Sequence, residues 1–319
     1  MIHTRLCELL GITHPIIQGG MAWVATAELS AAVSQAGGLG VLGGGNAPPD
    51  YVRDQIRALR RLTDRPFGVN VPLFSEFADD IMTVCIEEKV PIVSTGAGNP
   101  GPAIKRLKAE GIIVIPVVAS VALAKRLQKS GADALVAEGM EAGGHIGDVG
   151  TMALIPQVSA AVDIPVIAAG GISTGSGLAA SLMLGAAGIQ MGTRFICADE
   201  CLAHDNYKTH IVRASDRSTM TSGASLGHPV RSLRSPMSRK YAELERSGIT
   251  EEELIAFGTG ALRRAMQDGD WDTGTFMAGQ SAGLVSAIMS CQAIIEEVIA
   301  DAEAALNAGA GYIRQNAGE

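Results

Sequence analysis

Two carboxylates and an imidazole lie within one short glycine-rich loop of this chain. Glu138, Glu141 and His145 follow directly after a run of apolar residues, in the sequence EGMEAGGH. Glycine lets the backbone turn tightly and approach a ligand closely, and histidine is the side chain whose ordinary pKa lies closest to neutrality. The loop can therefore present an acid–base group to a substrate. A single loop histidine is equally compatible with capping or local hydrogen bonding, so the surrounding elements have to decide.

Short apolar runs and helical segments alternate along the chain and would position this loop. Runs rich in valine and isoleucine indicate buried parallel strands, and the segments between them show apolar residues at helical spacing. The predicted strands are 15–18, 39–42, 67–71, 91–95, 112–118, 134–138, 165–169 and 188–191, and the clearest helices are 49–62, 76–89, 102–110, 122–129 and 176–184. Eight strands that alternate with helices predict an α/β protein, a (β/α)8 TIM barrel rather than an open doubly wound sheet.

The alternation stops after the eighth predicted strand. Residues 199–276 are more polar, contain Pro229 and Pro236, and suggest a mixture of short helices. From residue 277 onward a helical pattern punctuated by glycine resumes, and we expect it to supply the last outer helix. The sequence therefore predicts a barrel made of residues 1–198 and 277–319, with residues 199–276 inserted as a smaller cap or lid over the barrel mouth.

Glycines at the carboxyl ends of the last two predicted strands indicate a phosphate site. The sequences AAGGI and MGTRF place Gly170, Gly171, Gly192 and Thr193 where barrels bind phosphate through backbone N–H groups. Residues 38–43 also match the pattern G-x-G-x-x-G. In that match the glycines run through a strand instead of joining a strand to a helix, so we do not expect a dinucleotide-binding turn there.

The acidic composition is typical of a protein that acts on small molecules, and it is equally well explained by solubility alone. The 319 residues carry 25 lysines and arginines against 33 acidic residues, a net charge of −8, which argues against nucleic acid as a partner. No run of the sequence suggests a membrane span, and the five scattered cysteines suggest a reduced compartment, so a cytoplasmic location is expected. Cys197 and Cys201 lack partners at zinc-ligand spacing, and no metal site is expected.

Several motifs, in order, give a family resemblance that covers nearly the whole chain. They are IIQGGMAWV, GGGNAP, PFGVNVP, TGAGNP, EGMEAGGHIG, PVIAAGGI, QMGTRF, GHPVR and MAGQSAGLV. The chain resembles the flavin-dependent enoyl-acyl-carrier-protein reductase II family of bacterial fatty-acid synthesis. It is similar, with looser motifs, to the related nitronate monooxygenases, which share the same FMN barrel.

The resemblance implies an FMN site built from several strand ends. It places the flavin on the loop after the first strand and near the ends of the third and sixth strands. It places the flavin's phosphate at the glycines that follow the last two strands. Carried over by position, the expected contacts are Gln18, Gly20, Met21, Ala22, Asn70, Glu138, Gly170, Gly171, Gly192 and Thr193. His145 is expected to face the reactive side of the flavin as the catalytic residue.

The same resemblance implies a reaction and leaves one carboxylate unassigned. NADH or NADPH would reduce FMN, which would pass a hydride to the β-carbon of a trans-2-enoyl thioester. His145, or a water that it holds, would donate a proton to the enolate that develops. Glu141 either raises the pKa of His145 or is a solvated loop carboxylate. The choice between NADH and NADPH and the acyl chain length cannot be read from these motifs.

An acyl carrier protein is strongly acidic, so this acidic chain needs a local basic surface to receive one. The run from His228 to Lys240 contains no acidic residue, and its basic side chains are a candidate docking patch: Arg231, Arg234, Arg239 and Lys240. The alternatives are a solvated face and contacts to the pyrophosphate of the nicotinamide cofactor. A homodimer is implied by the resemblance alone.

Three other functions remain open from the sequence. A nitronate monooxygenase would use the same barrel, flavin and histidine, but would consume oxygen and need no nicotinamide. An NAD(P)H:quinone reductase is a further enzymatic alternative. A non-catalytic barrel that senses a phosphate-bearing metabolite is the alternative from a different class.

Overall fold

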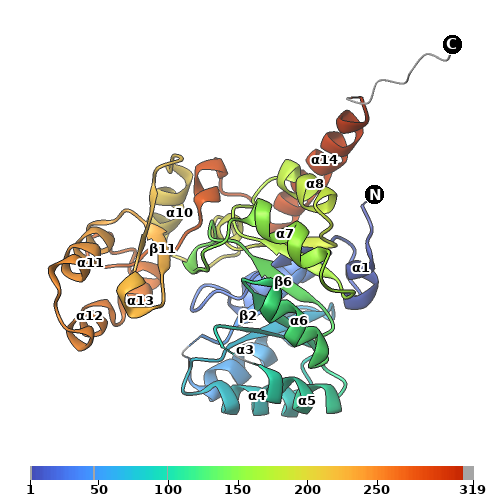
Figure 1. Cartoon of the computed structure of the whole chain (residues 1–319), viewed down its shortest axis with the longest axis horizontal. Helices are drawn as coiled ribbons and strands as arrows, with labels where there is room; N and C mark the ends of the chain where they lie inside the picture. Colours follow the sequence, from blue (N-terminus) through green and yellow to red (C-terminus); the bar gives the residue numbers. More distant parts are fainter. Residues whose placement is uncertain (1, 46, 99, 312–319) are drawn as a thin grey trace.

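Parallel strands form a closed barrel in the computed structural model, which describes residues 2–45, 47–98 and 100–311 (Figure 1). Neighbouring strands follow the chain order β1-β2-β3-β4-β5-β6-β8-β9 around the barrel, which confirms the predicted fold. The strands are β1 (Ile16–Gln18), β2 (Leu39–Gly43), β3 (Phe67–Pro72), β4 (Ile92–Gly96), β5 (Ile113–Val118), β6 (Leu135–Glu138), β8 (Val166–Ala169) and β9 (Gly188–Met191). Asn46 and Asn99, which belong to the motifs GGGNAP and TGAGNP, lie outside the described residues.

Helices surround the barrel, as the alternating pattern predicts. They are α1 (Arg5–Leu10), α2 (Ala27–Gln35), α3 (Pro49–Leu62), α4 (Ala78–Glu87), α5 (Gly101–Ala109), α6 (Val121–Lys129), α7 (Thr151–Ser159), α8 (Gly175–Met183), α9 (Thr193–Ile196) and α14 (Cys291–Ala310). In α3, Val52, Ile56 and Leu59 recur at helical spacing and are buried. They form the apolar stripe that packs on the barrel. Pro49 suits the first position of the helix, because an N–H at that position would have no acceptor within the helix.

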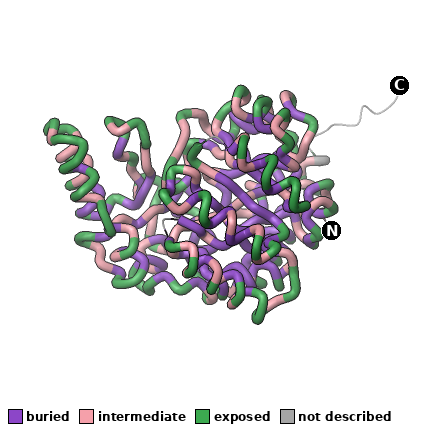
Figure 2. The backbone as a smooth tube through the Cα atoms, turned by 90° about the horizontal axis from the view of Figure 1, so that it is seen from below, coloured by how far each residue is buried: buried purple, intermediate pink, exposed green. Residues whose placement is uncertain are grey.

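The core consists of two layers, because side chains alternate between the two faces of each strand. Ile17, Val41 and Ile167 belong to an inner cluster that fills the barrel, whereas Ile16 and Leu42 join the cluster between barrel and helices. Leu6 and Leu10 of α1 also belong to the inner cluster, so α1 covers the amino-terminal end of the barrel. Figure 2 shows the buried backbone concentrated in the strands and the exposed backbone on the outer helices.

The segment between α9 and α14 contains a sheet that the sequence did not predict. It contains α10 (Asp205–Val212), β10 (Thr219–Ser222), η1 (Ala224–Leu226), β11 (Val230–Leu233), α11 (Pro236–Ser247), α12 (Glu251–Gly258) and α13 (Ala261–Gln267). These elements lie to one side of the barrel, on the left in Figure 1. β10 and β11 form an antiparallel hairpin, and β11 also pairs with the two-residue strand β7 (Gly144–His145) from the loop after β6. The insertion therefore shares a sheet with the loop that carries His145.

The last outer helix begins later than expected. Residues 277–290 do not form the helix that the pattern suggested; they include only the short 3-10 helix η2 (Gln280–Leu284). α14 starts at Cys291 because the side chain of Ser290 accepts a hydrogen bond from the N–H of Ala293. It packs against α8 and α2 and so completes the outer layer. Within the described ranges, no helix has the length and apolar character that a membrane crossing requires.

Candidate functional site

A cavity of about 1040 Å³ opens at the carboxyl ends of the barrel strands, beneath the insertion. This is the end of the fold at which barrel enzymes place their active sites. All the predicted site residues except Gln18 line it: Gly20, Met21, Ala22, Asn70, Glu138, His145, Gly170, Gly171, Gly192 and Thr193. The fold therefore brings together residues that are up to 173 positions apart, from Gly20 to Thr193, around a single space.

Gln18 lies elsewhere, although it belongs to the same strand end. Its side chain is fully buried and shares the outward face of β1 with Ile16. Its amide oxygen accepts from the N–H of Val41 at 3.2 Å, and its amide nitrogen donates to the carbonyl of Val41 at 3.2 Å. The side chain thus links β1 to β2, and the geometry gives no support to its assignment as a flavin contact.

Asn70 and Gly20 bring β3 and the loop after β1 close together. Asn70 occupies a position of β3 that alternates with the outward-facing Val69 and Val71, and it donates to the hydroxyl of Ser94 at 3.0 Å. A Cβ added to Gly20 would lie 2.2 Å from the Cβ of Asn70. Only glycine therefore allows this loop to lie against Asn70, and its backbone is left facing the cavity.

Glu138 is the carboxylate at the bottom of the cavity. It occupies the last position of β6 and has no hydrogen-bond partner within the described chain. The side chain keeps an intermediate exposure because it lines the cavity, but protein surrounds it at this depth. Burial therefore raises the pKa of Glu138 to about 7. A carboxyl group with such a pKa is present in both its acid and its base form near neutrality.

His145 lies in β7 at the cavity wall, between an aromatic ring and a second histidine. Its ring centroid is 5.3 Å from that of Phe74 and 6.5 Å from that of His228. The side chain stays exposed towards the cavity, but the surrounding protein desolvates its ring. This desolvation lowers the pKa of His145, and the nearby charge of His228 lowers it further. Pairing of His145 with Val230 in β11 fixes its backbone. The position agrees with the predicted acid–base role, which stays a prediction.

Glu141 has a structural role that neither expectation described. Its carboxylate accepts from the N–H of Thr151 at 3.0 Å and from the hydroxyl of Thr151 at 2.9 Å. It therefore caps the first turn of α7, where a negative charge is favoured. The oxygen of the same hydroxyl also lies 2.9 Å from the carbonyl oxygen of Gly170, so its single proton is shared between the two acceptors. Thr151 thereby connects Glu141 and the His145 loop to the loop after β8.

The loops after β8 and β9 form a glycine-lined cradle. Gly170 and Gly171 have positive φ values of 93° and 74°, a conformation that disfavours other residues. Within the described chain, the N–H groups of Gly171, Ile172 and Thr193 have no hydrogen-bond acceptor. Unpaired N–H groups beside the start of α8 suit a phosphate. This cradle, with Glu138 and Asn70 in the same cavity, fits FMN.

Residues of the insertion complete the cavity, and the sequence did not identify most of them. Tyr207, His228, Tyr241 and Arg263 line it from that side, and Phe74 lines it from the loop after β3. His228 belongs to the quoted motif GHPVR, so a signal for it existed. Arg263 also had a signal, because it belongs to the run GTGALRRA, which is part of the family resemblance. Tyr207 and Tyr241 had none, because only the packing of the insertion decides which side of their helices faces the barrel. Phe74 lies in a loop, whose direction no periodic pattern predicts.

The predicted docking patch is divided by the structure. Arg231 is 5% exposed and does not belong to a surface. Its guanidinium donates to the carbonyl of Met140 and to the hydroxyl of Thr219, at 3.2 and 3.3 Å, so it fastens the His145 loop to the hairpin. Arg234, Arg239 and Lys240 are exposed, and Lys240 is 3.4 Å from the carboxylate of Glu243.

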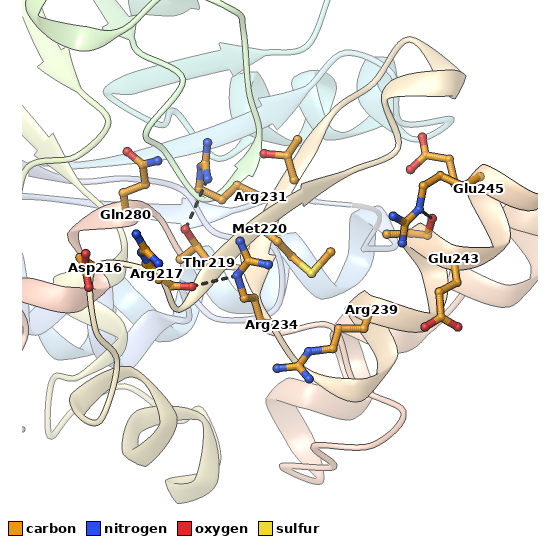
Figure 3. A pocket seen from close by; sticks show the side chains of 13 residues that line it. Asp216, Arg217, Thr219, Met220, Arg231, Arg234, Arg239, Glu243, Glu245 and Gln280 are labelled. Carbon is orange, nitrogen blue, oxygen red and sulfur yellow. Dashed lines mark hydrogen bonds between the residues drawn. The ribbon is translucent and has the colours of Figure 1, made fainter.

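A groove of about 790 Å³ lies on the other side of the β10-β11-β7 sheet (Figure 3). Val230 and Ser222 line the main cavity, whereas Arg231 and Thr221 line this groove. Its arginines are Arg217, Arg231, Arg234, Arg239 and Arg246. Among the described residues, no group of three or more histidine, cysteine, aspartate or glutamate side chains is arranged to hold a metal ion.

A closed parallel barrel with a glycine-lined phosphate cradle and acid–base side chains in the same cavity defines a flavin-binding barrel oxidoreductase. The chain belongs to the nitronate monooxygenase family of FMN-dependent oxidoreductases, whose model matches residues 3–84 and 76–301.

Three relatives are similar to this chain over nearly its whole length. FabK from Thermotoga maritima is 51% identical, with a TM-score of 0.96 over 98% of this chain and 100% of that chain. A (3aS,4S,5R,7aS)-5-hydroxy-7a-methyl-1-oxo-octahydro-1H-indene-4-carboxyl-CoA dehydrogenase from Mycobacterium tuberculosis is 35% identical over 94% of this chain and 96% of its own length. A probable nitronate monooxygenase from Staphylococcus saprophyticus is 35% identical over 96% of this chain and 99% of its own length.

Proposed function

We propose that this chain is an FMN-dependent enoyl-acyl-carrier-protein reductase of bacterial type II fatty-acid synthesis. It would pass a hydride from NADH or NADPH through FMN to the β-carbon of trans-2-enoyl thioesters. The observation that carries the proposal is 51% identity to FabK over 98% of the chain. The carboxyl-CoA dehydrogenase among the relatives supports a thioester substrate as well.

The residues of the cradle are proposed to hold the cofactor. The N–H groups of Gly171, Ile172 and Thr193 would bind its phosphate, and the backbone of Gly20 to Ala22, with Asn70 and Glu138, would contact its ring and ribityl chain. FMN, when bound, supplies the hydride acceptor and donor that links the nicotinamide to the thioester.

His145 is proposed to supply the proton. Reduction at the β-carbon leaves negative charge on the thioester oxygen, and a donor at the cavity wall stabilises it. The lowered pKa of His145 makes its imidazolium a stronger acid than an ordinary histidine. The rings of Phe74 and His228 lie 5.3 Å and 6.5 Å from the imidazole, centroid to centroid, and limit the orientations open to it.

Residues 199–276 are proposed to act as the cap of this site. Tyr207, Tyr241 and Leu262 from this segment line the cavity and would exclude water from the reacting atoms. We keep the boundaries predicted from the sequence, so the cap comprises residues 199–276 and the barrel comprises residues 1–198 and 277–319.

An acyl carrier protein is proposed to dock at the arginine groove. Four of its arginines, Arg217, Arg234, Arg239 and Arg246, form no ion pair within the described chain. Two of its carboxylates are already engaged: Glu243 with Lys240, and Glu245 with the N–H groups of Gly223 and Ser225. The groove therefore presents an excess of positive charge on a chain of net charge −8, with five arginines against Asp216, Glu243 and Glu245.

We further propose that the protein is a homodimer located in the cytoplasm. Sedimentation of the purified protein tests the oligomeric state.

An anaerobic spectral titration tests the function. We expect the purified protein to be yellow, to bleach with NADH or NADPH, and to regain its colour when crotonyl-CoA is added. The family match favours nitronate monooxygenase as the second candidate. In a nitronate monooxygenase, crotonyl-CoA would not restore the colour of the reduced flavin. That enzyme would instead consume oxygen when an alkyl nitronate is added in air, so the spectral titration and an oxygen-consumption assay together separate the candidates.

A further inference from the structure

The lining of the cavity is nearly free of fixed charge. Among the described residues around it, Arg263 is the sole arginine or lysine, and Glu138 is the sole acidic residue. Arg263 belongs to α13 of the insertion, whereas Glu138 lies at the end of β6. A positively charged side chain in such a lining is the natural partner for an anionic part of a ligand.

Arg263 is held in place by two contacts that leave its charge available. The centre of its guanidinium lies 5.2 Å from the ring centroid of Trp23, a cation–π distance. Its Nε donates to the side-chain oxygen of Gln267 at 2.8 Å. Within the described chain, its two terminal nitrogens have no acceptor and no carboxylate pairs with it. The fork of the guanidinium is thus oriented but unpaired.

Trp23 is itself held in an unusual conformation. Its φ of +65° is in the left-handed region, which a bulky residue rarely occupies. It follows Gly20 to Ala22 in the loop after β1, and its ring lies 5.9 Å from that of Tyr51. Backbone strain of this kind persists where the surrounding structure fixes it, and it is concentrated at functional sites. The indole therefore forms a fixed platform for Arg263 at the rim of the cavity.

We propose that Arg263 is a phosphate-binding residue for the incoming substrate, and this inference rests on the proposed function. Both substrates of that reaction carry phosphate: the carrier or CoA thioester in its phosphopantetheine arm, and NADH or NADPH in its nucleotide. A planar guanidinium binds a phosphate through two parallel hydrogen bonds, which an ammonium cannot do. The FMN phosphate is assigned to the cradle after β8 and β9, so Arg263 remains free for the substrate.

The test is Arg263→Gln in the FMN-loaded enzyme, with each substrate compared to a phosphate-free counterpart. Crotonyl-CoA is paired with crotonyl-N-acetylcysteamine, and NADH with 1-benzyl-1,4-dihydronicotinamide. We expect KM to rise about tenfold for a phosphate-bearing substrate and to stay unchanged for its counterpart, because one charge-assisted contact is lost. The substrate pair that shows the difference identifies the source of the phosphate. Retention of FMN is measured from the visible spectrum.

Two further variants keep the inference falsifiable. Arg213→Gln removes an exposed arginine of the insertion that lines neither space, and it should leave every KM unchanged. Arg263→Lys keeps the positive charge without the fork and should give an intermediate KM. Equal KM increases for the two members of each pair, no increase at all, or loss of FMN would overturn the inference. If the unmodified enzyme reduces no enoyl thioester, the proposed function fails, while the nicotinamide pair still tests Arg263 through the rate of flavin bleaching.

Discussion

Burial acts in opposite directions on the pKa values of His145 and Glu138, with the same effect on their charge. It lowers the pKa of the imidazole and raises that of the carboxyl to about 7. Both groups are thereby shifted towards their neutral forms at neutral pH. A cavity with little charge suits the entry of an uncharged acyl chain, and it strengthens each hydrogen bond made to a developing negative charge.

Replacement of His145 by alanine is expected to abolish turnover while FMN stays bound. His145 lies in β7, away from the glycine cradle of β8 and β9, so the flavin should be retained. Loss of a general acid costs roughly 10²- to 10⁴-fold in rate. The measurement is steady-state reduction of crotonyl-CoA together with the visible spectrum. An unchanged kcat would remove His145 from the catalytic role.

Replacement of Glu138 by glutamine is expected to stabilise the flavin-free protein at high pH. The folded pKa of about 7 lies above the ordinary value of 4.5. The unfolded chain therefore loses its proton first, and stability that is present below about pH 4.5 is lost as the pH rises through 7. The cost at pH 8 is at most about 3 kcal/mol for a shift of this size. Thermal unfolding of the variant and the parent protein at pH 5 and pH 8 measures this cost as their difference in stability. A difference of equal size at both pH values would contradict the explanation.

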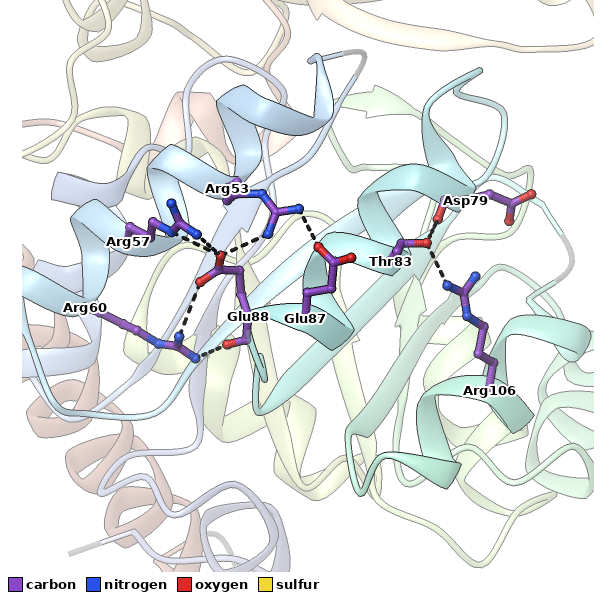
Figure 4. Close-up of polar contacts among 8 residues, drawn as sticks. All are labelled: Arg53, Arg57, Arg60, Asp79, Thr83, Glu87, Glu88 and Arg106. Atoms are coloured by element: carbon purple, nitrogen blue, oxygen red, sulfur yellow. Dashed lines mark hydrogen bonds and ion pairs between the residues drawn. The ribbon is translucent and has the colours of Figure 1, made fainter.

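At the scale of elements, an ion-pair network joins α3 to α4 on the outside of the barrel (Figure 4). The Glu88 carboxylate is 2.7 Å from a nitrogen of Arg57 and 3.0 Å from one of Arg53, and Arg60 also donates to the Glu88 carbonyl. Glu88 is 11% exposed, so its contacts are better shielded than those of an ordinary surface pair. The hydrogen bond from Arg57 is the main cause that lowers the pKa of Glu88.

Glu88→Gln is expected to lower the free energy of unfolding by about 1 kcal/mol at pH 7. Because the folded pKa of Glu88 is lowered, its contribution is present above the ordinary pKa and is lost as the pH falls through the lowered value. The difference from the parent protein should therefore shrink as the pH approaches 3. Glu87→Gln is the matched control, since Glu87 pairs with Arg53 alone among the described residues and is 52% exposed. Urea unfolding at several pH values measures the difference in free energy of unfolding between variant and parent. If that difference does not change with pH, the charge of Glu88 is not its cause.

Sequence periodicity predicted the barrel because buried strands and amphipathic helices leave local patterns. The range 49–62 matches α3 to the residue, and the eight predicted strands are the eight of the barrel. The direction of individual side chains was less predictable. Gln18 turns towards β2 and α2, although it ends a strand as Glu138 does, because the two occupy opposite faces in the alternation.

Roles that depend on distant partners were beyond the sequence. The sequence predicts Arg231 to be a surface charge beside Arg234. In the structure it is buried and donates a hydrogen bond to the carbonyl of Met140, 91 residues away in sequence. The sequence allowed Glu141 to be either a partner of His145 or a solvated loop carboxylate, yet its carboxylate accepts hydrogen bonds from Thr151. The cavity residues of the insertion were missed for the same reason, because only the tertiary packing turns them towards the barrel.

At the scale of the whole molecule, charge is unevenly distributed. The chain has a net charge of −8, whereas the groove on the other side of the β10-β11-β7 sheet is lined by four exposed arginines and by the buried Arg231 (Figure 3). Such local concentration guides an oppositely charged partner during encounter and is sensitive to ionic strength. The carrier protein proposed here would be attracted to this face and repelled by much of the remaining surface.

Reversal of charge at Arg234 and Arg239 is expected to weaken the use of carrier-bound substrate. The double variant Arg234→Glu and Arg239→Glu should raise the KM for crotonyl-acyl-carrier protein roughly tenfold, and that for crotonyl-CoA much less, because only the carrier adds an acidic surface. Added salt should reduce the difference between variant and parent. The double variant Arg61→Glu and Arg213→Glu changes the net charge by the same amount at two exposed positions outside the groove and is the matched control. Equal effects on the two substrates would count against docking at this face.

The pairing of β7 with β11 limits how the insertion can be exchanged between related enzymes. His145 and Gly144 are hydrogen-bonded into the sheet of the insertion, and Arg231 ties that sheet to Met140. A chimera that transplants residues 199–276 alone would therefore join a foreign sheet edge to the native histidine strand and shift the ring of His145. Substrate range is better redesigned by moving the loop from Glu138 to Gly150 and the insertion together, as one recombination unit.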